Sequence, residues 1–505
     1  MSDATIKNSQ LDTTSGGSFT ALSGTLESVS VAGNIILSAS TNQIPILKGT
    51  IRNDGVIQLV DDGSGYIGLD GEVTLNGSGA MTFVSSHFQF DYYAKQNKII
   101  NEAGHTLDGR ISIDIPFDNH GLFDANASGE YSYLLAPYAQ DTDQSTNTGV
   151  IQASNGAMLA FEPWNMDSAG GTIQAVGANS IVDITSNDAY IPGLVGGEFQ
   201  TSGGGVIKAS RTTLKGFTNH NTLAIESRYV PNPAFPEGRY INTITRLGGV
   251  VTNNGTISVA RVKEVNDPFE PGGITVDEIL TLNSSGELII KDALFLSGHY
   301  DSDQQRNDFL INSANHTVRV TDGVAGLATY IGPYITNHGT MTFEADVNWD
   351  PELDFSLIGS NGIQPNTVIN QGLIQVHNGA LVTVKNTEKQ FNNSNGLVTA
   401  TGADSILYVT DDRTTFHKIG LVTGGEFDAD NGGRVINNVT FQDFTNSGIF
   451  ENTPLASLQG MIQNNGEILI NDPFDWENND PFDWHGETPD GNLRALSCPT
   501  IAPRQ

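Results

Sequence analysis

Two histidines are the residues whose type and spacing first suggest catalysis. His120 and His338 occupy matching places in two copies of an Asn-His-Gly tripeptide, and a histidine can act as a general base near neutral pH. Other residues stand at the middle position in Asn370-Gln-Gly372 and Asn446-Ser-Gly448. We therefore interpret both histidines as turn residues beside glycine, and we predict no catalytic residue in this chain.

Two further stretches suggest calcium chemistry. Residues Gly63–Gly71 resemble the Gly-Gly-x-Gly-x-Asp nonapeptide, in which turn carbonyls and Asp carboxylates bind Ca²⁺. The match is single and imperfect, and the second half of the chain has nothing like it, so a surface turn is the favoured interpretation. The segment Asn471–Asp483 is rich in Asp, but exposed, flexible carboxylates bind calcium weakly. The sequence predicts no cofactor and no metal site, with calcium as the alternative.

One insertion has the composition of a binding loop. The span 219–249 is longer than the matching span 446–460, and the extra residues include Arg228–Tyr240, with three prolines, three aromatic residues and two arginines. Aromatic rings stack on sugars and on other apolar faces at low entropic cost. The predicted partner-binding residues are Arg228, Tyr229, Phe235, Arg239 and Tyr240. The alternative is a loop that packs on its own part of the fold.

The elements that must position these residues are repeats. The pattern Leu47–Leu59 returns as Leu247–Val259 and again as Leu458–Ile470, each time as a short strand, an Asn-Asx-Gly turn and a strand that alternates apolar and polar residues. Asn and Gly tolerate positive φ and so form tight turns at little steric cost. A Gly-Gly-x-Phe marker likewise occurs three times, at 16–19, 196–199 and 424–427.

The markers keep their order along the chain, which indicates a tandem duplication of a module of roughly 210 residues. We predict the end of one module at residues 1–59, a complete module at 60–259 and a second at 260–470. Residues 471–505 hold a doubled Asn-Asp-Pro-Phe-Asp-Trp linker and a loose tail.

The pattern predicts an all-β fold, a right-handed parallel β-helix (β-solenoid). Strand-turn units such as Asn-x-Gly-x-Ile recur about every 20–30 residues, and no stretch keeps a helical apolar period for three turns. In a solenoid each coil lays short strands on those of the coil before it, with Ile, Val, Leu and Phe inside. The alternative is a series of tandem β-sandwiches.

Charge and cysteine content narrow the possible partners. The net charge is −33, from 24 Lys and Arg against 57 Asp and Glu, which argues against nucleic acid and against an anionic membrane surface. Cys498 is the single cysteine, so no disulfide framework forms within the chain.

The start of the chain has no signal segment, and no run is apolar for long enough to span a membrane. Either the chain is cytosolic, or it belongs to a longer protein whose export signal lies elsewhere; the repeats favour the second.

The sequence resembles the repeat regions of large bacterial exported surface proteins, namely autotransporter passengers and filamentous-haemagglutinin-like adhesins. The resemblance rests on four recurring motifs between Gly16 and about Ile470. They are Asn-x-Gly-x-Ile, Asn-Gly-Ala-x-Leu, Gly-Gly-x-Phe and Gly-Gly-x-Val-Ile. The resemblance implies a non-enzymatic extracellular or cell-surface rod that binds surface polysaccharide or a cell-surface protein. The alternative is a polysaccharide lyase or glycosidase on a β-helix, which needs carboxylates and a base grouped in one module only.

Overall fold

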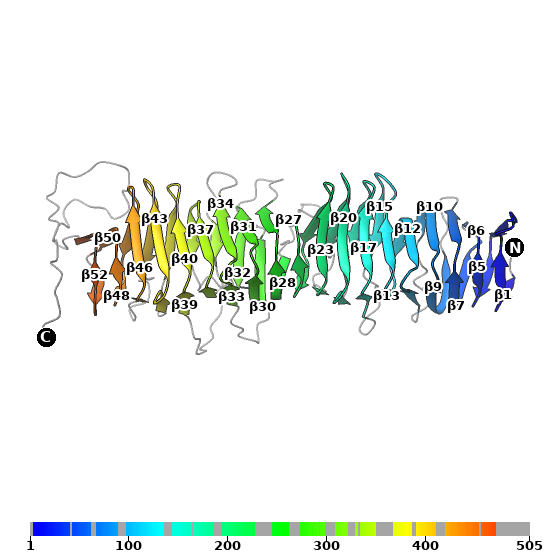
Figure 1. The fold of residues 1–505 in the computed structure, drawn as a ribbon, viewed down its shortest axis with the longest axis horizontal. Helices are drawn as coiled ribbons and strands as arrows, with labels where there is room; N and C mark the ends of the chain where they lie inside the picture. The colour runs from blue at the N-terminus through cyan, green and yellow to red at the C-terminus, as the bar shows by residue number, and fades with distance from the viewer. Residues whose placement is uncertain are drawn as a thin grey trace, which may run out of the picture. The chain divides into compact units, whose positions relative to one another are not determined.

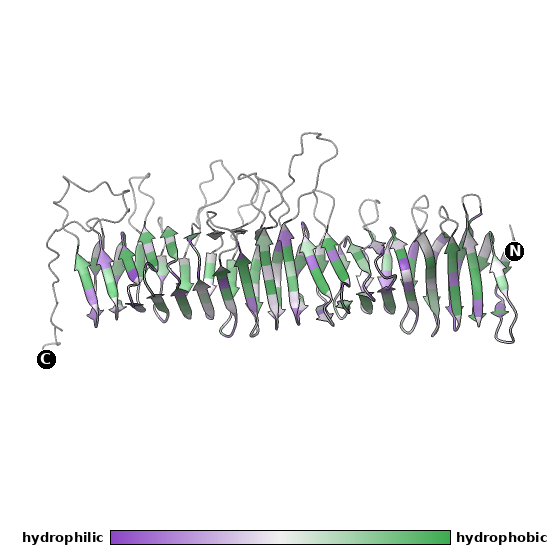
Figure 2. Ribbon diagram, turned by 90° about the horizontal axis from the view of Figure 1, so that it is seen from above, coloured by the Kyte–Doolittle hydropathy of each residue, from purple (hydrophilic) through white to green (hydrophobic). Residues whose placement is uncertain are grey.

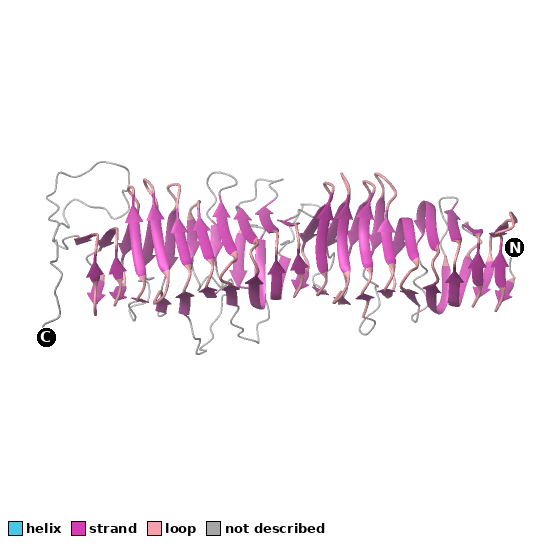
Figure 3. Cartoon of the chain, viewed as in Figure 1, coloured by secondary structure: helices cyan, strands magenta, loops and turns pink. Residues whose placement is uncertain are grey.

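The computed structural model describes residues 4–470 except 41–42, 62–66, 89–96, 136–143, 164, 186–192, 228–244, 262–272, 292, 298–308, 322–328, 332–333, 350–366, 386–389, 411–419 and 454–455. The described residues form β-strands joined by turns, with no helix among them (Figure 3). The chain divides into an N-terminal unit, Met1–Ser258 with Val262–Glu270, and a C-terminal unit, Val259–Arg261 with Pro271–Gln505.

The strands of the N-terminal unit stack in three ladders, which we call faces A, B and C. Face A contains β3 (Phe19–Ala21), β6 (Asn34–Ala39), β8 (Val56–Asp61), β10 (Ala80–Phe88), β12 (Thr106–Ile113), β14 (Leu122–Ala125), β17 (Val150–Ser154), β20 (Thr172–Val176), β23 (Glu198–Ser202) and β26 (Thr218–Asn219). Face B begins at the end of β12 and contains β15 (Tyr131–Leu134), β18 (Met158–Phe161), β21 (Ile181–Thr185), β24 (Val206–Ser210) and β27 (Thr222–Ser227). Face C contains β1 (Thr5–Lys7), β4 (Gly24–Glu27), β7 (Pro45–Asn53), β9 (Gly68–Asn76), β11 (Lys98–Asn101), β13 (Phe117–Asn119), β16 (Thr146–Asn147), β19 (Met166–Asp167), β22 (Gly193–Val195), β25 (Thr213–Lys215) and β28 (Thr245–Asn253), with β2 (Gln10–Asp12) and β5 (Ser30–Ala32) beside β7.

The C-terminal unit repeats the three faces, and we give each the letter of the face that it matches in sequence. Its face A contains β31 (Glu287–Lys291), β34 (Thr317–Thr321), β37 (Thr340–Phe343), β40 (Leu373–Val376), β43 (Leu397–Thr401), β46 (Glu426–Asp430), β49 (Thr445–Asn446) and β52 (Gln463–Asn464). Face B contains β32 (Leu294–Ser297), β35 (Thr329–Ile331), β38 (Val347–Trp349), β41 (Leu381–Lys385), β44 (Ile406–Thr410), β47 (Arg434–Asn437), β50 (Ile449–Asn452) and β53 (Glu467–Ile470). Face C contains β33 (Phe309–Asn312), β36 (Tyr334–Asn337), β39 (Thr367–Asn370), β42 (Gln390–Asn392), β45 (Leu421–Thr423), β48 (Thr440–Gln442) and β51 (Ser457–Gln459), while β30 (Gly273–Asn283) pairs with both β32 and β33, and β29 (Thr256–Arg261) spans the division between the units.

Within each unit a strand pairs in parallel with the equivalent strand of the next coil (Figure 1). In face A of the N-terminal unit, for example, Ile151 of β17 pairs with Ile173 of β20, which pairs with Phe199 of β23. Parallel strands need a crossover connection, and here the other two faces of the coil supply it. The parallel β-solenoid is therefore confirmed, and the alternative of tandem β-sandwiches, which are antiparallel, is wrong.

The alternation of the strands explains the packing. In β17 the side chains of Ile151 and Ala153 are buried while their neighbours are partly exposed, as the period of two residues in a strand requires. Apolar and polar residues alternate in the same way along many strands in both units (Figure 2). The buried side chains are mostly Ile, Val, Leu, Ala and Phe, so each coil gains its stability by covering the apolar interior of its neighbours.

The repeated Asn-Asx-Gly turn has a defined hydrogen bond. The side-chain oxygen of Asn53 accepts a hydrogen bond from the backbone N–H of Gly55 at 3.1 Å, and the second and third copies of the pattern form the same bond at 3.3 Å. A Cβ on Gly55 would collide with the carbonyl oxygen of Gly33 in the preceding coil. The glycine is therefore required by the close approach of two backbones rather than by its φ angle.

Candidate functional site

The predicted partner-binding residues lie outside the described part of the chain. Arg228, Tyr229, Phe235, Arg239 and Tyr240 all fall within 228–244. The linker Asn471–Asp483 and the first residues of the Gly63–Gly71 match also fall outside it. In the ranges that the structure does describe, no three His, Cys, Asp or Glu side chains are grouped so that they could hold a metal ion.

His120 and His338 lie in turns at equivalent places. The backbone N–H of His120 donates to the carbonyl of Asn101 at 2.7 Å, and that of His338 donates to the carbonyl of Asn312 at 2.8 Å. The His120 ring is partly exposed, with Nδ1 2.6 Å from the hydroxyl oxygen of Thr148, and His338 is exposed. The geometry agrees with turn residues that the scaffold holds through their backbone.

A ladder of buried asparagines runs inside the N-terminal unit. The amide Nδ2 of Asn101 donates to Oδ1 of Asn119 at 2.9 Å, and Asn119 donates in the same way to Asn147 at 2.9 Å. Asn147 then donates to the Ser168 hydroxyl at 3.0 Å. The first two amides also donate to backbone carbonyls, those of Leu122 and Val150, at 3.2 and 3.0 Å. Because only the NH₂ end of an amide can donate, these carbonyls fix its orientation, and every bond of the ladder points along the chain direction.

The C-terminal unit contains the same ladder at the matching positions. Asn312 donates to Asn337, Asn337 to Asn370 and Asn370 to Asn393, at 2.8, 2.8 and 2.7 Å. All four side chains are buried. A buried amide without partners is costly, whereas one that forms two or more hydrogen bonds stabilises the interior and sets the register of the coils.

A buried histidine begins each ladder. His105 Nδ1 lies 2.7 Å from Oδ1 of Asn101, and His316 Nδ1 lies 2.9 Å from Oδ1 of Asn312. On its other side, His105 Nε2 lies 3.3 Å from the amide Nδ2 of Asn53. An amide nitrogen can only donate, so Nε2 must accept and Nδ1 must carry the proton. His105 is therefore neutral. It accepts a hydrogen bond from Asn53 and donates one to Asn101, so these bonds have the same direction as those of the ladder.

Burial makes this neutral state stable. It lowers the pKa of His105 to about 4 and that of His316 to about 4, because the charged imidazolium loses its hydration inside the coil. A strongly shifted pKa in an open cleft would suggest catalysis. These rings are completely buried, so the shift reflects a structural role here.

Each ladder ends at a Gly-Gly-x-Phe marker. Gly425 has a φ of 76°, and a Cβ there would collide with the carbonyl oxygen and the side chain of Asn393. Gly197, with a φ of 89°, lies in the same way against Ser168. The marker therefore stops the ladder, because the coil that follows has no room for another side chain at this corner.

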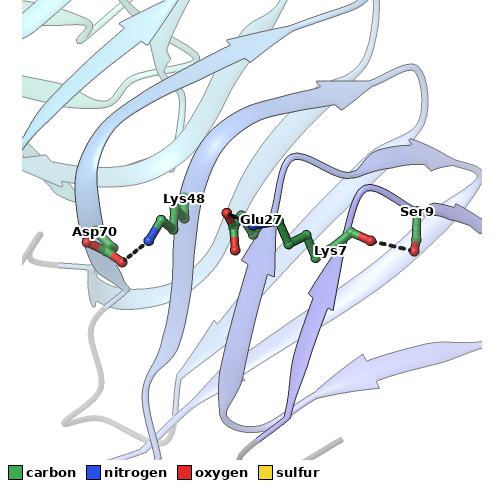
Figure 4. A network of polar contacts seen from close by, with 5 residues as sticks. All are labelled: Lys7, Ser9, Glu27, Lys48 and Asp70. Atoms are coloured by element: carbon green, nitrogen blue, oxygen red, sulfur yellow. Dashed lines mark hydrogen bonds and ion pairs between the residues drawn. The ribbon is translucent and has the colours of Figure 1, made fainter.

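The outward side of the coils carries charged residues in register. Lys7 forms an ion pair with Glu27 at 2.6 Å, and Lys48 of the next coil forms one with Asp70 at 2.7 Å (Figure 4). The hydrogen bond with Asp70, together with its negative charge, raises the pKa of Lys48. Exposed pairs of this kind contribute little to stability, so we assign them to solubility.

One pair of outward carboxylates differs between the units. Asp108 of β12 and Asp124 of β14 are direct neighbours on face A of the N-terminal unit. Partial burial, and to a smaller extent the negative charge of Asp124, raise the pKa of Asp108. Arg319 and Thr342 stand at the matching places in the C-terminal unit. A second group of carboxylates lies on β46, where burial and the negative charges of Asp430 and Glu426 raise the pKa of Asp428.

Sequence reasoning missed the ladders and the two buried histidines. The signal was present: Asn101–Thr106 and Asn312–Thr317 share an Asn and a His four residues apart. This match alone indicates only that the two segments are copies of one repeat, because an Asn and a His near a turn are ordinary turn residues. Burial of the amide is a property of the stacked coils and has no local sequence signature.

Comparison with known proteins gives no relative: no family model, no curated protein and no solved structure matches the chain. Within the described residues, no helix combines the length and the apolar character needed to cross a membrane.

Proposed function

We propose that this chain is a non-enzymatic structural or adhesive segment of a bacterial cell-surface or secreted protein, and that it binds surface polysaccharide through its outward faces. The observation that carries the proposal is the complete burial of His105 and His316. The two histidines with the most strongly lowered pKa values are fully buried and hydrogen-bonded to the asparagine ladders, at equivalent places in both units. These two histidines cannot contact a substrate, so we expect a partner to bind the outer surface.

The shape of the faces supports binding to an extended partner. Successive coils place equivalent residues about 4.8 Å apart along a face, so a partner that also repeats can form the same contact many times. Weak contacts that repeat add through multivalency. A cell-surface protein is the other class of partner that such a face could bind.

A second candidate function rests on Asp108 and Asp124. A carboxyl group with a raised pKa beside a second carboxylate is the arrangement that glycoside hydrolysis requires, and Asp108 beside Asp124 has it in the N-terminal unit. Asp428, whose pKa burial and the charges of Asp430 and Glu426 raise, has it in the C-terminal unit, so the pair is not a local exception to the repeat. The pair lies on the outward side of a flat sheet face, where Ser154 also donates a hydrogen bond to Asp124 at 2.8 Å. We therefore place hydrolysis second.

The test is incubation of the purified chain with acidic and neutral polysaccharides, with and without calcium, measuring retention and the appearance of new reducing or unsaturated ends. We expect retention without new ends. Release of oligosaccharide that Asp108→Asn abolishes would refute the proposal and establish the second candidate.

A further inference from the structure

The repeat offers a way to find a binding site, because a site should be a local exception to it. Face B of the N-terminal unit has such an exception at β15, where Tyr131 and Tyr133 alternate with the buried Ser132 and Leu134. By register with the neighbouring strands, the C-terminal unit has Asp346 and Asn348 at the places of these tyrosines. The fold does not require tyrosine at these two places, since the second unit has Asp and Asn there.

The two tyrosines form one aromatic surface. Their ring centroids are 6.2 Å apart with an angle of 24° between the planes, and Tyr131 is 44% exposed. The strand beneath them is fixed, because the hydroxyl of the buried Ser132 accepts a hydrogen bond from the backbone N–H of Ile111 at 3.0 Å and donates one to the carbonyl of Gly109 at 3.4 Å. The rings are therefore held outward by a rigid element, which lowers the entropic cost of binding.

The aromatic surface continues as a narrow apolar row across the coils. Tyr131 pairs in register with Met158, which pairs with Ile181, which pairs with Val206. The adjacent outward row is more polar, with Asp183 and Lys208 in the register of Tyr133. Ion pairs stand close by, Arg110 with Glu130 at 3.3 Å near the tyrosines and Lys208 with Glu226 at 3.1 Å near Val206.

We infer that Tyr131, Tyr133 and Met158 form a binding subsite for a neutral polysaccharide chain that lies along the coils of face B; this inference rests on the proposed function and names its site and its ligand. A row one residue wide is far smaller than the roughly 800 Å² that each partner contributes to a standard protein–protein interface. It suits a linear ligand with apolar CH faces and polar edges, which aromatic rings bind by stacking. The net charge of −33 disfavours an anionic polymer.

The test uses affinity electrophoresis of the whole chain through gels that contain a soluble β-glucan, a mannan, a galactan or the acidic polygalacturonate. We expect at least one neutral polymer to retard the parent chain. The double variant Y131A/Y133A should lower the apparent affinity about tenfold or more, because both stacking contacts are lost. Y131F/Y133F keeps both rings and should stay within about twofold of the parent.

Two controls separate this inference from the proposed function. Leu381→Ala removes an exposed apolar side chain at the place of Met158 in the C-terminal unit, and it should leave retardation unchanged. Circular dichroism and thermal melting of each variant confirm the fold. Retardation that survives Y131A/Y133A, or that only the acidic polymer causes, would overturn the subsite and leave polysaccharide binding standing. No retardation by any polymer would overturn both.

Discussion

At the place where the N-terminal unit carries Tyr131 and Tyr133, the C-terminal unit carries Asp346 and Asn348. Beneath these different surfaces the interiors agree closely: a neutral histidine begins an asparagine ladder in each unit, and a Gly-Gly pair ends it. Duplication has thus preserved the residues that satisfy buried polar groups, where each loss is costly, while outward residues have changed. The comparison teaches that differences between the units, and not the repeated motifs, indicate where a partner binds.

Breaking a ladder should have the largest effect and should act equally in both units. Asn119→Ala removes hydrogen bonds to Asn101, Asn147 and the carbonyl of Val150, and Asn337→Ala does the same in the second ladder. Several buried groups then lose partners, so we expect each change to lower the free energy of unfolding by about 4 kcal/mol. Urea unfolding followed by circular dichroism measures this, and hydrogen exchange assigns the loss to one unit. A loss below about 1 kcal/mol, or a loss in one unit only, would contradict a shared interior.

Acid should weaken both units through the buried histidines. The unfolded chain takes up a proton at each histidine near pH 6.5, whereas the folded chain does so only near pH 4. The unfolded state therefore binds more protons between these values, and stability is present above pH 6.5 and is lost as the pH falls toward 4. A shift of this size corresponds to about 3 kcal/mol for each histidine. The raised pKa of Asp108 acts in the opposite direction and offsets a small part of the loss.

Urea unfolding at pH 7 and at pH 4 tests this prediction. The double variant H105Q/H316Q has lower stability at pH 7, but it should lose much less than the parent between the two pH values, because neither glutamine titrates. Equal acid sensitivity in the variant and the parent would show that other groups dominate and that the histidines are not the neutral members of the ladders.

The fold was largely predictable from the sequence, while the candidate site was not. The order of the markers and the apolar–polar alternation predicted a parallel solenoid because both arise locally, from turn residues and from strand period. The partner of each buried amide depends on which residue of the next coil, 18 to 33 positions away, stands in register. Tyr131 and Tyr133 were missed because aromatic residues in a strand have an ordinary packing explanation. The predicted loop at Arg228–Tyr240 stays a prediction.

Grafting the aromatic pair would sharpen the comparison with a moderate effect. In the variant D346Y/N348Y, one tyrosine stands directly before β38 and the other on β38, at the places that match Tyr131 and Tyr133. We expect the number of polysaccharide binding sites per chain to rise from one to two in isothermal titration with a short neutral oligosaccharide, with similar affinity at both. An unchanged stoichiometry in a folded variant would mean that the tyrosines alone do not define the subsite.

The turn histidines should give the smallest effect. His120→Ala and His338→Ala leave the backbone hydrogen bonds to Asn101 and Asn312 in place, so we expect each to change the free energy of unfolding by less than about 0.5 kcal/mol. Retention on polysaccharide should stay within about twofold of the parent. Loss of retention or of any turnover through one of these changes alone would overturn their assignment to the scaffold.

Oxidative footprinting with and without a retained neutral polysaccharide tests the central claim most directly, because tyrosine and methionine side chains report their own exposure. Our account predicts that the polymer protects Tyr131 and Met158 in the N-terminal unit, that the exposed Leu381 at the matching place in the C-terminal unit stays as reactive as before, and that no oligosaccharide is released. Protection at Leu381 equal to that at Met158, or unchanged labelling of Tyr131 while the polymer is bound, would contradict it.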